Sequence, residues 1–398
     1  MRYAPITDRL AHLGGAKWQV HLRARAMAAA GVQILSLTIG EPDTPPPAEL
    51  LTRAREAMEA GRTAYSNGRG EPELLDALAA RYTRRCGRTI GTNQIACLPG
   101  TQTALYAVMQ TLIGPGDEVL VGDPMYATYE GVIAATGGKM VPVPLRPEHG
   151  FRMQAADLAA RVTDRTRLVL INTPHNPTGA VLTLDDVRAR GVVARDHDLW
   201  ILSDEVYEEM IFAKDGVVGA FASPLDQADL AERVIAVTSI SKSHAAPGFR
   251  SGWCVGPGCF VDRLLPVAET MLFGNQPFIA DMTALAVSKP SVVARGMADR
   301  FARRAALIHT LLHGNHLRVH QPDAGMFTVV DVRATGLSGE EFAHALLEQE
   351  HVAVMPGESF GQGLQGWLRV SLTRPDDEID EACRRIAAFS RRLMERAT

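Results

Sequence analysis

Directly after an apolar, β-rich run, the chain carries the stretch Ser239-Ile240-Ser241-Lys242-Ser243-His244-Ala245-Ala246-Pro247-Gly248-Phe249-Arg250-Ser251-Gly252-Trp253. A lysine just past the carboxyl end of a buried strand faces the crevice in which open parallel sheets bind ligands. There its amine can condense with an aldehyde if burial or nearby positive charge keeps part of it neutral, which arginine cannot do. Because the chain has five lysines against 36 arginines, Lys242 is less easily explained as an incidental surface charge. Ser239, Ser241 and Arg250 add two hydroxyls and a guanidinium able to bind a phosphate dianion.

Around this stretch, from about Ala48 to Ala284, short apolar β-rich runs alternate with longer stretches of helical periodicity. This alternation is typical of a mostly parallel sheet covered by helices, so the predicted fold class is α/β. The clearest strands each end where a polar or Gly/Pro-containing segment begins, and they are Glu118 to Val121, Leu168 to Asn172, Trp200 to Ser203 and Val234 to Ser239. Ligands of such sheets collect at the carboxyl ends of the strands.

The end of the chain predicts a second, smaller domain, because 398 residues are too many for one ordinary domain. Helical periodicity runs from about Ser291 to His316, and short strands follow at Met326 to Asp331 and Trp367 to Leu372. The apolar run Leu35 to Ile39 leads into the turn-forming Gly40-Glu41-Pro42-Asp43, and we expect these first forty or so residues to return to the smaller domain. The predicted division is 40–290 for the large domain, and 1–39 with 291–398 for the small domain.

Composition favours small molecules as partners. The net charge is only −4 and the aromatic share 6%, so neither a basic stripe for nucleic acid nor an acidic tail dominates the surface. The five cysteines show no CxxC spacing and no histidine at metal-ligand spacing, which predicts a reducing compartment and no metal site. Since no run of about 18 uninterrupted apolar residues occurs, we expect no membrane partner and a cytoplasmic protein.

Three further runs place chemically active side chains beside predicted elements. In Ser203-Asp204-Glu205-Val206-Tyr207, the carboxylate at the end of an apolar strand would have no structural partner unless it met a cation. Pro99-Gly100-Thr101-Gln102-Thr103-Ala104-Leu105 is a turn that opens into a helix, whose free backbone NH groups attract an anion. Leu368-Arg369-Val370-Ser371 places an arginine inside an apolar strand with no adjacent acid, which is costly unless an anion arrives.

The lysine stretch fits, residue for residue, the form S-x-S-K-x-x-x-x-x-G-x-R-x-G of the class I/II aminotransferases, which are fold-type I enzymes dependent on pyridoxal 5′-phosphate (PLP). The run Asn172-Thr173-Pro174-His175-Asn176-Pro177-Thr178-Gly179 resembles the family's N-P-x-N-P-T-G element, with Thr173 and His175 at its variable places. The resemblance covers nearly the whole chain. It implies a mostly parallel seven-stranded sheet between helices, a smaller α+β domain, and PLP as cofactor.

The resemblance also implies roles for single residues. Lys242 holds PLP as a Schiff base and shuttles a proton from the substrate's Cα, Asp204 pairs with the pyridine nitrogen, and Tyr207 shares the phenolic oxygen with Asn176. These are the implied catalytic residues, with Asn176 as a cofactor ligand. The resemblance also implies a phosphate cup made of Gly100, Thr101, Gln102, Ser239, Ser241 and Arg250. Tyr126 would stack on the cofactor ring, and Tyr65 would reach the cofactor of the neighbouring subunit.

For the substrate, the resemblance implies that Arg369 clamps the α-carboxylate with a bidentate fork, a geometry that lysine could not supply. Gly40 would lie on the same carboxylate, and Asn176 would contact the substrate as well as PLP. Because Tyr65 would reach the phosphate of the neighbouring subunit, the active unit is expected to be a homodimer with shared active sites.

Two other functions remain open beside a two-half-reaction (ping-pong) aminotransferase. Enzymes of the same fold that eliminate a β-substituent, decarboxylate or oxidise their substrate share the cofactor site, so the motifs alone do not exclude them. A ligand-sensing regulator would need a DNA-binding module ahead of Gly40. Only about forty residues stand there, which are too few and not basic enough.

The substrate itself has the weakest signature. The runs Gly122 to Glu130, Thr173 to Pro177 and Ser241 to His244 look more like arginine:pyruvate transaminases than like aspartate aminotransferases. Aspartate-using relatives of this subgroup place a lysine in the phosphate-cup turn for the distal carboxylate, and this chain has Gln102 there. We therefore expect a basic amino donor, L-arginine above all, with pyruvate as acceptor.

A guanidinium would need an acid in the pocket, and Glu41, Asp8 and Glu269 are equally open for that role. The alternative is a broad-specificity enzyme for neutral or aromatic amino acids. A pocket lined by Trp18, Met271 and Phe273 would favour it.

Overall fold

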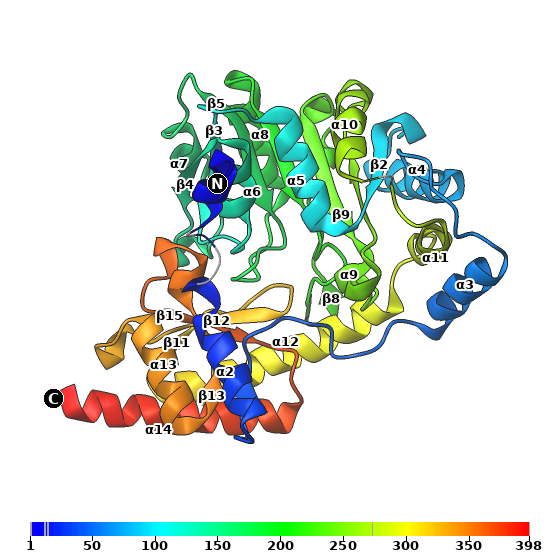
Figure 1. The fold of residues 1–398 in the computed structure, drawn as a ribbon. Coiled ribbons are helices and arrows are strands. Elements are labelled where there is room, and N and C mark those ends of the chain that lie inside the picture. The colour runs from blue at the N-terminus through cyan, green and yellow to red at the C-terminus, as the bar shows by residue number, and fades with distance from the viewer. Residues whose placement is uncertain (1, 12, 14–15, 273, 398) are drawn as a thin grey trace.

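Two domains lie one above the other in Figure 1, drawn from a computed structural model that describes residues 2–11, 13, 16–272 and 274–397. The upper domain is built on a seven-stranded sheet in the order β2-β10-β9-β6-β5-β3-β4. Its strands are β2 (Ile95–Leu98), β3 (Glu118–Asp123), β4 (Lys139–Pro144), β5 (Thr166–Asn172), β6 (Trp200–Asp204), β9 (Val234–Ser239) and β10 (Gly252–Val255). Neighbours pair in parallel except at β10, which runs antiparallel to β2 and β9. The predicted α/β class and mostly parallel sheet are confirmed.

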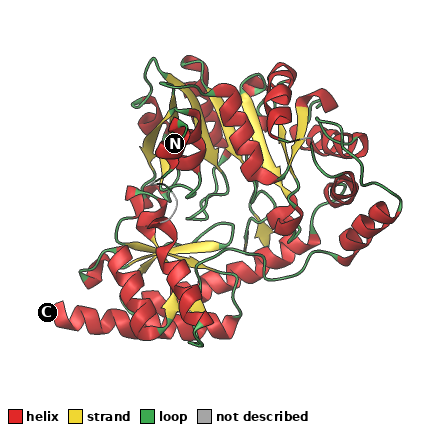
Figure 2. Cartoon of the chain, viewed as in Figure 1, coloured by secondary structure: helices red, strands yellow, loops and turns green. Residues whose placement is uncertain are grey.

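Helices cover both faces of this sheet (Figure 2) because its strands are apolar on both faces. Leu168 and Leu170 of β5 pack with the helices on one face, whereas Val169 and Ile171 pack with those on the other. The first face carries α5 (Gly100–Leu112), α6 (Tyr129–Thr136) and α10 (Gly258–Met271); the second carries α4 (Pro72–Cys86), α8 (Leu184–Asp196) and α11 (Pro277–Val287). The remaining elements of this half of the chain are α3 (Ala48–Glu59), α7 (Ala155–Ala159), α9 (Ile240–Ser243), β7 (Ala213–Lys214) and β8 (Val217–Val218).

The lower domain has its own core around a four-stranded antiparallel sheet in the order β11-β12-β15-β14. Its strands are β11 (Arg318–Val319), β12 (Phe327–Asp331), β14 (Met355–Pro356) and β15 (Trp367–Ser371), and its helices are α2 (Gln19–Ala29), α12 (Val292–His313), α13 (Gly339–Glu350) and α14 (Asp376–Ala397). Strand β1 (Leu35–Ser36) pairs in parallel with β13 (Val352–Ala353), so this short strand lies in the lower domain.

Helix α1 (Pro5–Leu10) takes a different course and lies beside α6 of the upper domain (Figure 1), where Arg9 Nε donates a hydrogen bond to Ala134 O at 2.8 Å. The domain boundaries expected from the sequence therefore remain a prediction. No helix in the described part of the chain combines the length and the apolar character needed to cross a bilayer.

A buried charge cluster ties the turn that begins at Gly40 to the lower domain. Asp43 accepts hydrogen bonds at 2.7 Å from Arg300 Nη2 and from Arg304 Nη1. Arg304 also donates through Nε to Asp376 at 2.6 Å. The Arg304 side chain is only 8% exposed and that of Asp43 11%, so each charge depends on the other for compensation.

We expect the substitution Arg304→Leu to lower the free energy of unfolding by about 3 kcal/mol, because it leaves a buried carboxylate short of a partner. The matched control is Arg384→Leu, which removes an exposed pair with Asp380 on α14 and should change the free energy by less than about 1 kcal/mol. Urea unfolding followed by circular dichroism at fixed protein concentration measures both. Equal losses in the two variants would show that burial does not set the strength of the Arg304 pair.

Candidate active site

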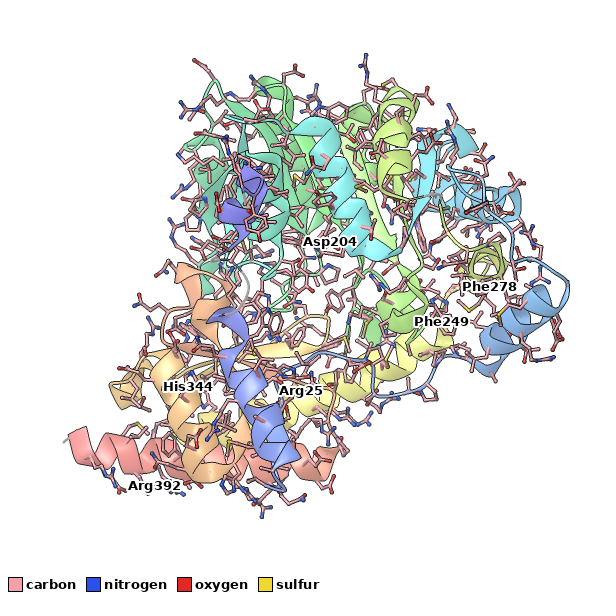
Figure 3. All side chains as sticks on the ribbon, viewed as in Figure 1. Arg25, Asp204, Phe249, Phe278, His344 and Arg392 are labelled. Atoms are coloured by element: carbon pink, nitrogen blue, oxygen red, sulfur yellow. The ribbon has the colours of Figure 1, made fainter. Side chains whose placement is uncertain are left out.

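A cavity opens at the carboxyl ends of β5, β6 and β9, where the upper domain faces the lower one. Figure 3 shows Asp204, at the end of β6, in the middle of the molecule between the two domains. Twelve of the site residues predicted from the sequence line this cavity: Gly40, Thr101, Gln102, Tyr126, Asn176, Asp204, Tyr207, Ser239, Ser241, Lys242, Arg250 and Arg369. Segments far apart in the chain thus meet at one place.

Lys242 stands in the short helix α9, directly after β9, and its Nζ donates a hydrogen bond to Gly40 O at 2.9 Å. Burial lowers the pKa of Lys242 to about 8; the charge of Glu41 opposes this shift, and the charges of Arg369 and Arg250 add to it. About a tenth of the amine is then neutral at pH 7, which suits a nucleophile that also has to carry a proton.

Asp204 is a buried carboxylate that receives its hydrogen bonds from neutral donors. Tyr129 Oη donates to Oδ2 at 2.6 Å, and the backbone NH of Val206 donates to Oδ1 at 3.2 Å. Burial raises the pKa of Asp204 to about 6, and these two hydrogen bonds offset part of the rise. Above about pH 6 the site therefore presents a buried negative charge, which a cation can stabilise.

Asn172 holds Asn176 near Asp204, and Tyr207 in turn hydrogen-bonds with Asn176. The Asn172 side chain donates to Asp204 O at 3.1 Å and accepts from the backbone NH of Asn176 at 2.7 Å. A hydrogen bond between Tyr207 and Asn176 partly opposes the burial that raises the pKa of Tyr207 well above its usual range. The tyrosine hydroxyl is therefore protonated at neutral pH and available as a donor.

The turn that opens α5 forms a concave group of donors. Gly100 has a φ of +82°, and a Cβ added there would lie 2.3 Å from Arg250 Nη2, so only glycine lets the guanidinium approach the turn. Thr101 Oγ1 donates to Ser239 Oγ at 3.0 Å, and Ser241 stands two residues further along. Hydroxyls, a helix N-terminus and an arginine therefore converge as a phosphate dianion requires.

Arg369, in β15, lies between two aromatic rings, with its Cζ 3.8 Å from the centre of the Phe327 ring and 4.3 Å from that of Phe360. Nη2 donates to Thr38 O at 2.6 Å and Nη1 to Asn176 Oδ1 at 3.2 Å, whereas the buried Nε has no hydrogen-bond partner. Burial lowers the pKa of Arg369 to about 10. An arriving carboxylate would supply the missing negative charge and acceptor.

A salt-bridge cluster behind the site anchors the backbone between Asp204 and Tyr207. Arg85 on α4 donates through Nη1 to Glu205 Oε2 at 2.9 Å and to Glu208 Oε2 at 2.6 Å. Successive strand residues point to opposite faces, so Asp204 faces the cavity while Glu205 faces this cluster.

Two predicted site residues are not among the twelve that line the cavity. Gly100 lies against Arg250 at the edge of the cavity, whereas Tyr65 lies outside the cavity, beside a second hollow. The Tyr65 side chain is 90% exposed beside this hollow, which residues 63–66 and 274–278 line within the described part of the chain. A position on the outer surface is what a contact with a second subunit requires.

Sequence analysis missed several residues that the fold brings to the cavity. Tyr129 stands three residues after Tyr126, and this spacing was the available signal. Phe327 and Phe360 belong to segments with no motif of their own, so their stacking on Arg369 left no trace in the sequence. Trp18 lines the cavity, as its predicted place in a substrate pocket requires, and Phe273 lies outside the described residues.

These residues fit PLP. The Gly100 turn with Arg250 beside it would suit a phosphate, the buried carboxylate of Asp204 a protonated pyridine nitrogen, and the partly neutral amine of Lys242 an aldehyde. The unpaired Nε of Arg369 is an unused hydrogen-bond donor that would suit a substrate carboxylate in addition. Among the described residues, no group of three or more His, Cys, Asp or Glu side chains is placed to bind a metal ion.

Comparison with known proteins also indicates a PLP-dependent enzyme. Residues 32–386 match the family model for aminotransferase class I and II. The chain is 42% identical over 398 residues to the arginine–pyruvate transaminase of Pseudomonas aeruginosa, which covers 100% of both chains. It is 33% identical over 356 residues to an aromatic-amino-acid aminotransferase of Thermococcus litoralis, which covers 89% of this chain and 90% of that one.

Solved structures agree in fold. A double mutant of the aspartate aminotransferase of Thermus thermophilus superimposes with a TM-score of 0.90 at 28% identity, over 98% of this chain and 100% of that one. The aspartate aminotransferase of Rhizobium meliloti superimposes with a TM-score of 0.91 at 28% identity, over 98% of this chain and 99% of that one. Because the relatives match in sequence and in fold along the whole chain, this protein belongs to the class I and II aminotransferases and is a PLP-dependent aminotransferase.

Proposed function

We propose that this aminotransferase moves the α-amino group of L-arginine to pyruvate in two half-reactions. The observation that carries the proposal is the 42% identity, over the full length of both chains, to an arginine–pyruvate transaminase. The cavity supports it, because Gln102 stands in the phosphate-cup turn where aspartate-using relatives place a lysine. Its Oε1 accepts a hydrogen bond from Thr128 Oγ1 at 2.9 Å, so it offers the distal carboxylate of aspartate no charge partner.

Lys242 is the proposed nucleophile and proton carrier. When bound, PLP supplies an aldehyde and a ring that takes up the electron pair left on the substrate's Cα. Lys242 Nζ is partly neutral because its pKa is about 8, so it can condense with an aldehyde carbon with loss of water. Once the substrate's amino group has displaced it, the freed amine can accept the proton from Cα. The hydrogen bond to Gly40 O keeps Nζ at the mouth of the cavity.

Asp204, Tyr207 and Asn176 are proposed to set the charge on the cofactor. Above about pH 6 the Asp204 carboxylate is ionised and stabilises a proton on the pyridine nitrogen. The Tyr207 hydroxyl and the Asn176 amide donate to the phenolic oxygen. Tyr126 is proposed as the stacking platform, and its ring is steadied by an edge contact with Tyr129 at 5.6 Å between centres.

Two anion sites complete the assignment. The phosphate is proposed to bind at the α5 turn and the residues around Lys242, namely Gly100, Thr101, Gln102, Ser239, Ser241 and Arg250. Arg369, with Gly40 and Asn176 beside it, is proposed to hold the α-carboxylate. The rigid stacking of Arg369 between two phenylalanines supports this role, because it fixes the plane of the guanidinium before substrate arrives.

We further propose a homodimer in which Tyr65 reaches the phosphate bound by the partner subunit. The 90% exposure of Tyr65 supports this arrangement, as do Leu51 and Met58 of α3, which are 43% and 44% exposed. A cytoplasmic location is proposed on the five free cysteines, three of them buried.

Among the three acids open for the guanidinium, Glu41 is the proposed partner. It follows Gly40, which lines the cavity, and its charge acts on the pKa of Lys242. Asp8 stands on α1, away from the cavity, and the Glu269 carboxylate lies against Gly68. The second candidate function, use of neutral or aromatic donors, rests on Trp18 in the cavity wall and on the relative named for aromatic amino acids.

We expect arginine to give a kcat/KM at least tenfold above those of aspartate and phenylalanine with pyruvate as acceptor, a difference of about 1.4 kcal/mol. Steady-state assays over lysine, ornithine, aspartate and phenylalanine test this. Alanine should form in equal amount to the arginine consumed. Aspartate or phenylalanine outrunning arginine tenfold would contradict the donor assignment, and ammonia or CO₂ in place of alanine would point to a lyase or decarboxylase.

The substitutions Asp204→Asn and Arg369→Ala should fail in different ways. Asp204→Asn should still bind PLP but lose most of kcat, because the ring nitrogen loses its counterion. Arg369→Ala should instead weaken amino-acid binding by about 2 to 5 kcal/mol, as expected when a buried charge pair is broken. Rapid-mixing absorbance titrations separate affinity from rate. Unchanged donor affinity in Arg369→Ala would place the carboxylate site elsewhere.

The substitution Glu41→Gln should lower kcat/KM for arginine about tenfold, because a hydrogen-bonded charge is lost, and change that for alanine by less than about threefold, both measured in the donor half-reaction from the change in cofactor absorbance. Glu269→Gln makes the same chemical change away from the cavity and serves as control. A parallel fall for arginine and alanine would show that Glu41 acts on Lys242 rather than on the substrate.

A further inference from the structure

His175 occupies a variable place in the motif that contains Asn176, and its ring joins two loops of the upper domain. The ring is buried between the loop after β5 and the loop after β3. Its Nε2 lies 3.1 Å from Pro124 O, and its Nδ1 lies 2.7 Å from Thr178 Oγ1. No role assigned above to a site residue uses this side chain.

The hydrogen bonds around His175 have one consistent direction. Burial lowers the pKa of His175 to about 4, so the ring is neutral in the physiological range and has one donor and one acceptor. Pro124 O can only accept, so Nε2 carries the proton. Nδ1 then accepts from the Thr178 hydroxyl, which in turn accepts from the backbone NH of Ala180 at 3.3 Å. The Pro124 carbonyl thus fixes the tautomer, and the Thr178 hydroxyl matches it.

The two loops carry residues that face the same ring. Pro124 stands two residues before Tyr126, the proposed stacking platform, and His175 is followed directly by Asn176. Asn176 is linked through the Asn172 side chain to the backbone of Asp204. His175 therefore extends this chain of contacts from the backbone of Asp204 to the loop that carries Tyr126.

The platform loop has other contacts. Within the upper domain, Leu145 N donates to Asp123 O and Thr128 Oγ1 donates to Gln102 Oε1, but neither partner stands in the Asn176 loop. Two more contacts come from the lower domain. Met125 N donates to Phe360 O at 2.7 Å, and Gly363 N donates to Asp123 Oδ1 at 3.0 Å. A link within the upper domain keeps the distance between Tyr126 and Asn176 independent of where the lower domain lies.

A neighbouring histidine, His320, also has a largely buried ring but does not connect two loops. His320 packs edge-on against Phe151 at 4.9 Å between ring centres, and its buried Nε2 has no hydrogen-bond partner. It shares the burial and the lowered pKa, to about 4, but joins no loop of the cavity. The two histidines are therefore a matched pair.

We propose that His175 is a positioning residue that holds the Tyr126 loop against the Asn176 loop through an Nε2–H to Pro124 O hydrogen bond, and so fixes the slot that receives the PLP ring. The inference rests on the site roles proposed above but not on the identity of the amino donor. It requires the hydrogen-bond polarity of the side chain, not merely its volume.

Four variants test this in the full-length enzyme: His175→Leu, His175→Gln, Thr178→Val and His320→Leu. His175→Leu should lower kcat about tenfold and weaken PLP affinity several-fold, with KM for the donor within about twofold, because the ring slot and not the carboxylate site is loosened. His175→Gln offers the same donor and acceptor and should recover most of both. His320→Leu should stay within about twofold of the parent protein, at a melting temperature lowered at least as much as in His175→Leu.

A second measurement does not depend on catalysis. In the ¹⁵N spectrum of the full-length protein before PLP is added, one histidine should show the Nε2-protonated tautomer with no titration around neutral pH, and His175→Gln should remove that signal. If His175→Leu does not fold, Thr178→Val should lower kcat about threefold, because the His175 ring loses the hydrogen bond that holds it at Nδ1.

Several outcomes would overturn the proposal. Among them are an unchanged kcat in His175→Leu or Thr178→Val, equal losses in His175→Leu and His320→Leu, and no recovery in His175→Gln. A signal for His175 that titrates near neutral pH would do the same. None of these depends on arginine being the donor, so failure of the substrate assignment is separately visible.

Discussion

Lys242, Asp204 and Arg369 meet in one cavity without forming an ion pair with one another or with another described residue. Burial acts on each in the direction that disfavours charge, and the pKa values move to about 8, 6 and 10. The surroundings compensate with neutral partners: a tyrosine hydroxyl, backbone groups and two aromatic faces. Such a site is short of counter-charges that PLP and an amino acid bring, so the cost of burial is offset only when both bind.

Buried charges on either side of the cavity are paired, in contrast to the three inside it. Glu205 is next to Asp204 in the chain, yet strand alternation turns it to the other face of the sheet, onto Arg85. Asp43 is likewise paired twice, with Arg300 and Arg304. These pairs hold the backbone on either side of the cavity, so the uncompensated groups stay where the reaction needs them.

Gly40 shows how the two domains share one site. A Cβ at this position would lie 2.2 Å from the Phe327 ring, so glycine alone lets the turn pass between the domains. Its carbonyl accepts from Lys242 of the upper domain, and the same turn is tied to the lower domain through Asp43. Arg369, which contacts Thr38 O, and the amine of Lys242, which contacts Gly40 O, are therefore coupled through a single backbone segment.

The sequence by itself determined the α/β class, the clearest strands and the place of Lys242, Asp204 and Arg369, because strand ends and phosphate turns are local patterns that one segment can carry. Tertiary structure alone decided which side chains surround them. Tyr129 reaches Asp204 across 75 residues, Arg369 reaches Asn176 across 193, and His175 reaches Pro124 across 51. Partners at such separations are set by the packing of whole elements, and no short stretch of sequence records that packing.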